Sequence, residues 1–578
     1  MENIKRQQVL GFTGGVLFVI LINNFWRWKK KQNVLKKIKS KSVECKRAFD
    51  YVVEQLKKGN LSEDEVSQIV QLSFNDLHQQ LQDGTLKAVT VLQAYQAFAL
   101  KANERLNAIT EPLVTAMDIA EKLDKQTGKK GLLHGIPVSV KESFDIKSLD
   151  TTAGISHFIG KPRPDDAALI KVLKDEGAIP FVRTNIPQTM MIYECSNPIY
   201  KETLNPYDLT KTPGGSTGGE SALLGAKASI IGYGSDIGGS IRVPSHFCGC
   251  YGLKTTLERL SRKGTLSLSK GQMQVSGTVG PMARDLDGLI MAFKVLLTDL
   301  HFELDPSIPP IKFRDEIYNS KQSLKIGYYV TDGYTPAVPS CRRAVMLTKK
   351  ALEAMGHTVV EFKPPRMVYA YTKLYLGTVM GDKGKNYTSK LKGDIIDPTI
   401  WKLMLPSKLP NFILRMMSWL YPILTKDKVF GDILKARMGI NSVHDWFNHA
   451  LKIQAYKEEF LSAWRREDLD AVICPPFAMA APPLGKVADV ISAGNYSMIY
   501  NLLNYPGGVL PVTKVTADDV NDLDNYPTNT RTLKLVKQFS MKSEGLPVGV
   551  QCVCLPFNEE LVLRLMREAE NGLNKLQD

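Results

Sequence analysis

The order of apolar and polar positions predicts short strands that alternate with amphipathic helices. Apolar runs bounded by turn residues predict strands at residues 136–140, 179–182, 229–232, 324–329, 471–474 and 548–552. Apolar residues at helical spacing predict helices at residues 62–82, 90–102, 165–176, 342–355 and 559–570. This alternation predicts an α/β domain with a mixed sheet. Because no repeat or long flexible linker divides it, we expect one domain over residues 75–575.

The N-terminus has a different pattern. No residue from Gln7 to Trp26 is charged, and twenty helical residues span about 30 Å, the thickness of one hydrocarbon core. The alternatives are a cleaved signal peptide and a helix that lies in the membrane interface. No small-residue cleavage site follows the segment. We therefore expect a transmembrane signal-anchor at residues 7–26.

Basic residues follow this segment directly. Residues 27–47 hold ten Lys and Arg against Glu44 alone, and the whole chain has a net charge of +15. A nucleic-acid-binding tail is the alternative. Next to an apolar span, attraction to anionic lipid is the simpler account, so we expect a basic stalk and helical lead-in at residues 27–74 and no nucleic-acid partner. The positive-inside rule then places the body in the cytoplasm.

The cysteines and histidines argue against a metal site. The chain has eight of each, with no CxxC pair and no HExxH spacing. We therefore expect reduced thiols, no structural zinc and no bound metal.

A second apolar stretch lies within residues 403–440. Residues 412–424 are largely apolar, too short to span a bilayer, interrupted by Pro422 and flanked by basic residues. This composition suits a helix that lies among lipid headgroups. A buried helical hairpin is the alternative, and periodicity alone does not separate the two.

Two glycine-serine segments carry the candidate chemistry. They are residues 213–220, PGGSTGGE, and residues 234–242, GSDIGGSIR. Glycines gather where backbone approaches a ligand or adopts a positive φ. A P-loop is excluded because neither segment contains GxxxxGK[ST]. Residues 214–218 match GxSxG, but that motif needs a preceding strand and residues 205–213 are turn-like. A lipase with Ser216 as nucleophile is therefore the weaker reading.

Together with residues 135–142, these segments resemble the amidase signature family. The family's pattern is G-x-P-x-x-x-K upstream, then GGSxGG and D-x-GGS-x-R, and all three occur here in that order. Each is weak alone, whereas the three together are specific. The resemblance runs from about residue 70 to the C-terminus. It implies the amidase signature fold, an α/β fold with a large twisted mixed β-sheet surrounded by helices.

The resemblance implies a Ser-Ser-Lys triad. Ser240 is the nucleophile, and Lys141 is the base that acts on it through Ser216. Such a base is needed because a serine hydroxyl attacks an amide only when activated. A lone lysine is more often a solvated strand end, but the valines beside Lys141 predict partial burial, which lowers a lysine pKa toward neutrality. The resemblance also implies a cis peptide bond between Gly215 and Ser216.

Substrate contacts are expected around the nucleophile. Backbone N–H groups of the nucleophile loop are candidate donors to a developing oxyanion, namely those of Ile237, Gly238, Gly239 and Ser240. Ser216 is expected to contact substrate as well. Met190 matches a substrate-contacting position of the family, and a core methionine is the alternative. Met191 stands where close relatives carry an aromatic residue, which leaves the acyl preference open.

The anchor and the 403–440 insertion favour one branch of the family, the membrane-bound fatty acid amide hydrolases of animals. Glutamine-dependent amidotransferase subunits, the rival branch, lack both features. The branch implies hydrolysis of N-acylethanolamines such as anandamide and primary amides such as oleamide through an acyl-enzyme, without a cofactor. It also implies a homodimer at the endoplasmic reticulum or another endomembrane, with residues 403–440 as a membrane cap. The non-enzymatic alternative is a membrane-tethered binding scaffold.

Overall fold

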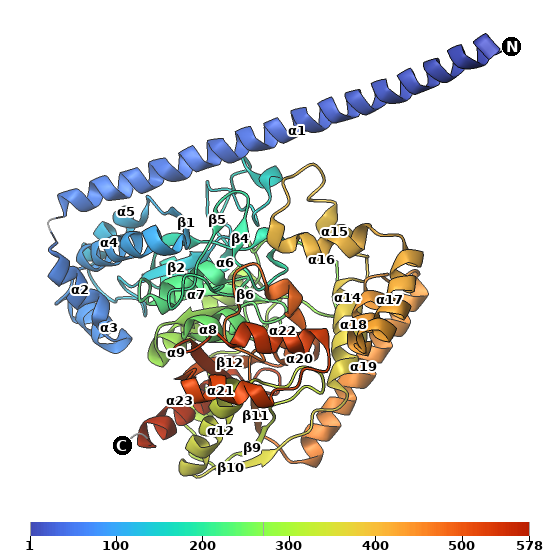
Figure 1. The fold of residues 1–578 in the computed structure, drawn as a ribbon. Coiled ribbons are helices and arrows are strands. Elements are labelled where there is room, and N and C mark those ends of the chain that lie inside the picture. Colours follow the sequence, from blue (N-terminus) through green and yellow to red (C-terminus); the bar gives the residue numbers. More distant parts are fainter. Residues whose placement is uncertain (1, 60, 270, 577–578) are drawn as a thin grey trace.

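The computed structural model of the chain describes residues 2–59, 61–269 and 271–576, with side chains from residue 21 onward. An eleven-stranded mixed sheet forms the centre of the body, and helices surround it (Figure 1). From one edge to the other, the strands are β1 (Ile109–Pro112), β3 (Ile179–Thr184), β2 (Pro137–Lys141), β6 (Ile231–Asp236), β8 (Thr278–Ala283), β7 (Tyr251–Lys254), β12 (Gly507–Lys514), β13 (Pro547–Cys554), β11 (Ala471–Cys474), β9 (Lys325–Tyr328) and β10 (Thr358–Glu361). The α/β class with a mixed sheet is therefore confirmed.

The predicted strands coincide with strands of this sheet, with ends that differ by a few residues. One predicted helix is wrong in its extent. Residues 62–82 form two helices, α2 (Glu63–Gln71) and α3 (Phe74–Asp83), because the Ser73 side chain accepts a hydrogen bond from the Asp76 N–H and starts a new helix. Predicted helices in the body correspond to α4 (Ala88–Leu106), α6 (Ala168–Asp175), α12 (Pro339–Ala354) and α23 (Glu559–Lys575).

The pairing of β2 with β6 brings the predicted chemistry together. The two strands are parallel neighbours, with Val140 opposite Tyr233. All five residues of β2 are buried, as expected for a strand covered on both faces. Because parallel strands end at the same edge of a sheet, Lys141 at the end of β2 lies near the end of β6, where its Nζ contacts Ser235. The loop that holds Ser240 starts there.

The N-terminal part of the chain is one long helix, α1 (Glu2–Lys58). Of the expected signal-anchor at residues 7–26, residues 7–20 lie outside the residues whose side chains are described. Among the described residues, we find no helix both long enough and apolar enough to cross a bilayer. Residues 21–33 are exposed, whereas Val34, Ile38 and Cys45 are buried against the body.

The expected basic stalk contains one buried charge. Lys41 Nζ donates to Glu111 Oε2 at 3.1 Å, and both side chains are buried. Arg183 of β3 donates to the other oxygen of Glu111 at 2.9 Å and also to the backbone carbonyl of Glu142. Glu142 directly follows Lys141, so a buried ionic chain joins α1 to the end of β2. Lys41 is thus the member of the expected basic stalk that pairs with the body.

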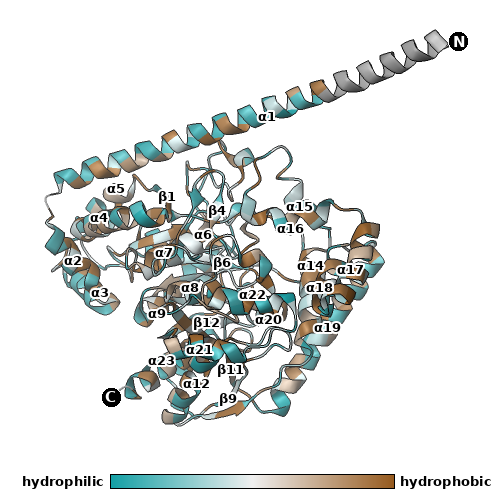
Figure 2. Ribbon diagram, viewed as in Figure 1, coloured by the Kyte–Doolittle hydropathy of each residue, from teal (hydrophilic) through white to brown (hydrophobic). Residues whose placement is uncertain are grey.

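The 403–440 region forms three helices, α16 (Pro398–Lys408), α17 (Asn411–Thr425) and α18 (Lys428–Ala436). Two residues of α17 are buried, Leu414 and Ser418. Its apolar side chains are largely exposed, including Phe412, Trp419 and Leu424, with Trp419 67% exposed. Figure 2 shows α17, with many residues coloured as hydrophobic, at the outer edge of the molecule. The alternative of a buried helical hairpin is therefore wrong.

The N-terminal end of α1 and the outer surface of α17 lie on the same side of the molecule (Figure 1).

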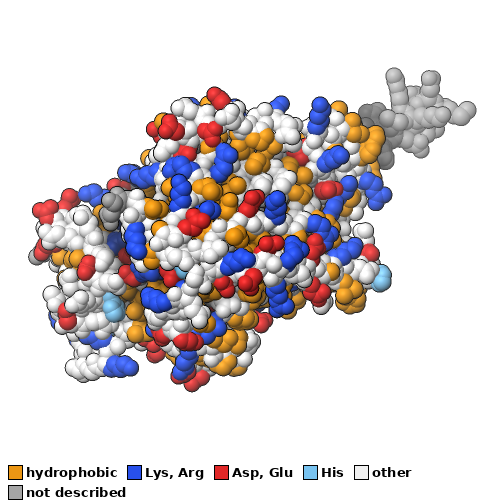
Figure 3. All heavy atoms as spheres, turned by 90° about the horizontal axis from the view of Figure 1, so that it is seen from below, with side chains coloured by type: hydrophobic (Ala, Val, Ile, Leu, Met, Phe, Trp, Pro, Cys, Tyr) orange, Lys and Arg blue, Asp and Glu red, His pale blue; other side chains and the backbone are white. Residues whose placement is uncertain are grey.

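The charged side chains are distributed differently from the apolar side chains of α17. On the face drawn in Figure 3, Lys and Arg side chains are interspersed with Asp, Glu and apolar side chains. The net charge of +15 is thus not gathered into a single patch on that face.

Candidate active site

Lys141 is buried and surrounded by hydroxyl groups. Its Nζ lies 2.8 Å from Ser216 Oγ, 2.9 Å from Thr217 Oγ1 and 3.0 Å from Ser235 Oγ. Burial lowers the pKa of Lys141 to about 7, although Asp236 and other nearby acidic groups act in the opposite direction. A substantial fraction of the lysine is therefore neutral at physiological pH and can accept a proton.

Ser216 lies in the loop before α7 (Gly218–Gly225), where the chain packs very tightly. The Gly215–Ser216 peptide is cis, as the resemblance implied. A Cβ at Gly215 would lie 2.2 Å from the carbonyl oxygen of Glu194, and one at Gly219 would lie 2.3 Å from the Asn185 nitrogen. Neither position admits a side chain, which explains why glycines flank Ser216.

Ser240 lies in a loop that the ion pair of Asp236 and Arg242 holds. Arg242 Nη2 lies 3.0 Å from Asp236 Oδ1, and both side chains are fully buried. The same carboxylate accepts the N–H groups of Gly239 at 2.7 Å and Ile241 at 3.0 Å. These bonds fix the turn between β6 and α8 (Arg242–Cys248), and the Arg242 guanidinium keeps the pKa of buried Asp236 well below its usual range.

The four expected oxyanion donors differ in their hydrogen bonds. The Gly239 N–H already donates to Asp236, so it is engaged inside the loop. For the N–H groups of Ile237, Gly238 and Ser240, no acceptor is found in the described part of the chain. Three of the four expected donors thus have no acceptor among the described residues.

The two serines share one cavity. Ser240 is 5% exposed and Ser216 is 2% exposed, and both line a cavity of about 510 Å³. The backbone also joins their loops, because the Thr217 N–H donates to the Ser240 carbonyl at 3.2 Å. The structure therefore brings Lys141, Ser216 and Ser240 together. Lys141 is hydrogen-bonded to Ser216, but no bond between the Ser216 and Ser240 hydroxyls is found in the described part of the chain.

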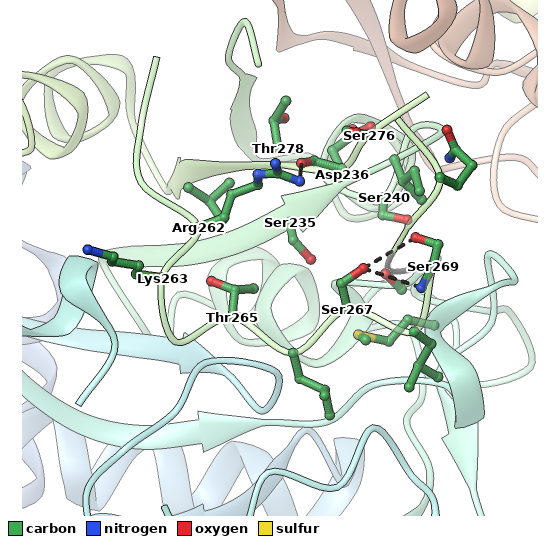
Figure 4. Close-up of a pocket in the computed structure, with 18 of the residues that line it drawn as sticks. Ser235, Asp236, Ser240, Arg262, Lys263, Thr265, Ser267, Ser269, Ser276 and Thr278 are labelled. Atoms are coloured by element: carbon green, nitrogen blue, oxygen red, sulfur yellow. Dashed lines mark hydrogen bonds between the residues drawn. The ribbon is translucent and has the colours of Figure 1, made fainter. Parts of the chain in front are cut away.

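Two cavities with different linings meet at Ser240. The 510 Å³ cavity has many hydroxyl groups and two basic side chains in its wall, and Figure 4 shows Arg262 and the surrounding Ser and Thr residues. The second cavity is narrow, about 70 Å³, and mainly apolar. Met190, Met191 and Ile237 line both cavities. Met190 is thus part of a cavity wall and only partly buried in the core.

The sequence did not indicate three polar neighbours of Lys141. Thr217 and Ser235 both accept from its Nζ, as described above. Buried Glu220 contacts Ser139 and lies 2.8 Å from Thr184 Oγ1, and burial raises its pKa to about 8. Thr217 and Glu220 lie inside the PGGSTGGE segment, and Ser235 directly precedes Asp236. Their positions within the two motifs could have identified them as candidate neighbours of Lys141.

The lipase alternative requires a histidine beside Ser216. The histidine nearest to the nucleophile in sequence is His246, which is fully buried. Its ring contacts the Met479 carbonyl at 3.0 Å and the Gly549 N–H at 2.9 Å. No histidine is among the described residues that line either cavity. The geometry therefore disfavours Ser216 as the nucleophile of a Ser-His enzyme.

Comparisons with known proteins agree with this geometry. The family model described as "Amidase" matches residues 90–563. The chain is 40% identical to fatty-acid amide hydrolase 1 of Sus scrofa, over 87% of this chain and 86% of that protein. It is 37% identical to fatty acid amide hydrolase 1 of Caenorhabditis elegans, over 86% and 88%. A solved structure of a fatty acid amide hydrolase has a TM-score of 0.77 and 25% identity, covering 93% of this chain and 95% of that one. This chain belongs to the amidase family.

Proposed function

We propose that this chain is a serine hydrolase that cleaves fatty acid amides to free fatty acid and amine, with N-acylethanolamines such as anandamide and primary amides such as oleamide as substrates. One observation carries the proposal. A buried lysine of near-neutral pKa contacts Ser216 in the wall of the cavity that holds Ser240. The identity to proteins named fatty acid amide hydrolase supports the substrate class.

The chemistry proceeds as a proton relay. Neutral Lys141 takes the proton of Ser216 while Ser216 takes that of Ser240, and the Ser240 oxygen forms a bond to the amide carbon. The negative charge on the carbonyl oxygen is stabilised by the backbone N–H groups around Ser240. As the tetrahedral intermediate collapses, the relay reverses and protonates the leaving amine. Water then cleaves the acyl-enzyme ester by the same route and releases the fatty acid.

The two cavities suit the two halves of such a substrate. The narrow apolar cavity would hold the carbons of the acyl chain nearest the amide, at about 0.8 kcal/mol per buried CH₂. The hydroxyl-lined cavity would receive the amine and water. Because the two meet at Ser240, an amide bond positioned there would have its apolar and polar parts in matching surroundings.

Covalent labelling with mass mapping tests the proposed nucleophile. A fluorophosphonate probe reacts with activated serines, and we expect the label on the peptide that contains Ser240. A label on Ser216 would support the lipase reading, and no label would support a binding scaffold. In parallel, release of oleic acid from oleamide is measured for wild type and Ser240→Ala. Equal release by both proteins would refute the proposal.

We also propose that the enzyme is held at an endoplasmic reticulum or other endomembrane by a single-pass anchor at residues 7–26, with the catalytic domain in the cytoplasm. Residues 403–440 would add a membrane cap, because exposed apolar side chains of α17 lie between basic flanks. The test uses a truncated variant that lacks the anchor. Charged residues in place of Trp419 and Leu420 should weaken its retention on vesicles of anionic lipid, and unchanged retention would refute the cap.

A homodimer is proposed as the assembly. On α19 (Val443–Arg466), Val443, Phe447 and Leu451 lie on one face at helical spacing and are each more than 60% exposed. Such an apolar stripe suits contact with a second copy. The mass of the detergent-solubilised enzyme, measured by light scattering, should be that of two chains and should halve in a Phe447→Glu, Leu451→Glu variant. A wild-type mass of one chain would refute the dimer.

A further inference from the structure

One side chain in the wall of the apolar cavity lacks a charged partner among the described residues. Arg437 directly follows α18 and is 8% exposed. It lines the same cavity as Ser240, together with apolar residues such as Ile433. Its Nη1 donates to the Leu403 carbonyl at 2.5 Å, and this is the hydrogen bond found for the guanidinium in the described part of the chain.

The surroundings of Arg437 do not compensate its charge. Burial lowers its pKa, and the group that acts in the opposite direction is Tyr371, not a carboxylate. Tyr371 lines the same cavity and is 2% exposed. The Tyr371 hydroxyl also has no hydrogen-bond partner among the described residues. Because Arg437 lines the cavity and its Nε and Nη2 have no partner among the described residues, a ligand bound there could supply acceptors for the charge.

We propose that Arg437 and Tyr371 form a polar subsite that binds a carboxylate carried on the acyl chain of the substrate. Nε and Nη2 of a guanidinium can donate side by side to two carboxylate oxygens, and the Tyr371 hydroxyl can add a third bond. The substrate class is therefore the amides of dicarboxylic acids, with the amide at Ser240 and the second carboxylate at Arg437. This inference rests on the proposed function, because it assigns the apolar cavity to the acyl chain.

A purely structural role makes a different prediction. Through the Leu403 carbonyl, Arg437 joins the end of α18 to α16. If that contact were its whole role, removing the side chain would affect the turnover of every substrate alike. A role in recognition instead changes the ratio of kcat/KM between carboxylated and plain acyl chains. This ratio is independent of how much of the protein is folded.

The experiment compares alkanamides with their ω-carboxy analogues in a homologous series, using the full-length enzyme in detergent. Wild type should hydrolyse the ω-carboxy amide as well as the plain amide, or better, at one optimal chain length. In Arg437→Met the kcat/KM ratio at that length should fall about tenfold or more, because a charge-assisted pair is lost. Lys435→Met is the matched control, since it removes an exposed charge two residues away and should leave the ratio unchanged.

An unchanged ratio in Arg437→Met overturns the proposal. Where that variant does not accumulate as folded protein, Tyr371→Phe supplies the test, and the ratio should fall about threefold for one lost hydrogen bond. The wild-type enzyme alone can also refute the proposal. If it hydrolyses ω-carboxy amides at least about 100-fold more slowly than plain amides at every chain length, the carboxylate has no partner in the cavity and the proposal fails. If wild type hydrolyses neither amide, the proposed function fails first and this inference fails with it.

Discussion

Replacing Lys141 with methionine separates the role of its amine from that of its bulk. In the unfolded chain the lysine keeps its proton up to pH 10.5, whereas in the folded protein burial lowers its pKa to about 7. Between these values the unfolded state binds more protons, so the stability of wild type rises with pH. Below pH 7 both states are protonated, and the folded protein carries the full cost of a buried charge.

The magnitude follows from the same two values. The interval from 10.5 to about 7, at about 1.4 kcal/mol per pH unit, corresponds to a cost of about 5 kcal/mol in the free energy of unfolding below pH 7. Methionine removes that cost. It also removes hydrogen bonds to Ser216, Thr217 and Ser235, each worth about 1 kcal/mol. We therefore expect Lys141→Met to lose activity and to be more stable than wild type by about 1 to 2 kcal/mol near pH 7.

The assay is unfolding of both detergent-solubilised proteins at a series of pH values. The stability advantage of Lys141→Met should shrink by about 1.4 kcal/mol per pH unit between pH 7 and pH 10.5. Ser240→Ala is the control, because it is inactive but keeps the lysine and hence the pH dependence of wild type. A constant difference across this interval would refute the reasoning. So would a wild-type kcat/KM that does not fall as the pH drops below 7.

Four further changes have expected outcomes. Ser240→Ala should lower kcat about a millionfold in an oleamide assay, whereas Ser216→Ala should lower it by about 10² to 10⁴, because it removes a proton carrier and leaves the nucleophile. Lys41→Met should destabilise the protein by about 1 to 3 kcal/mol in urea unfolding, while Lys57→Met, in an exposed pair on the same helix, should have no measurable effect. Asp236→Asn should cost about 3 to 5 kcal/mol and lower kcat, since Arg242 and the nucleophile loop lose their acceptor.

The site could be predicted from the sequence where tight packing restricts the residue type. Gly215 and Gly219 approach backbone atoms too closely for any Cβ, so the loop around Ser216 tolerates few sequences and keeps a recognisable pattern. The burial of Lys141 followed from its valine neighbours, because a run of apolar residues predicts a strand covered on both faces.

Other features of the structure could not be predicted from the sequence, because they depend on residues that are distant along the chain. Lys41 looked like one more charge of a basic stalk, and its partner Glu111 lies 70 residues further along the chain. The exposure of Trp419 and its neighbours was open for a similar reason, since a helical period shows that one face is apolar but not whether protein covers that face. Arg437 resembled a basic flank of the cap, and the folded cavity shows that it is buried with no carboxylate partner among the described residues.

The buried ionic chain gives α1 a structural role in the body, separate from the proposed anchor. Arg183 lies between Glu111, which holds Lys41 of α1, and the carbonyl of Glu142, which directly follows Lys141. A helix that was only a tether would need no buried charge, because apolar contacts such as those of Val34 and Ile38 hold it against the body. Since α1 is continuous from residue 2 to residue 58, the contact at Lys41 also fixes its direction relative to β2. The direction of α1 and the position of the candidate base are therefore determined by the same contacts.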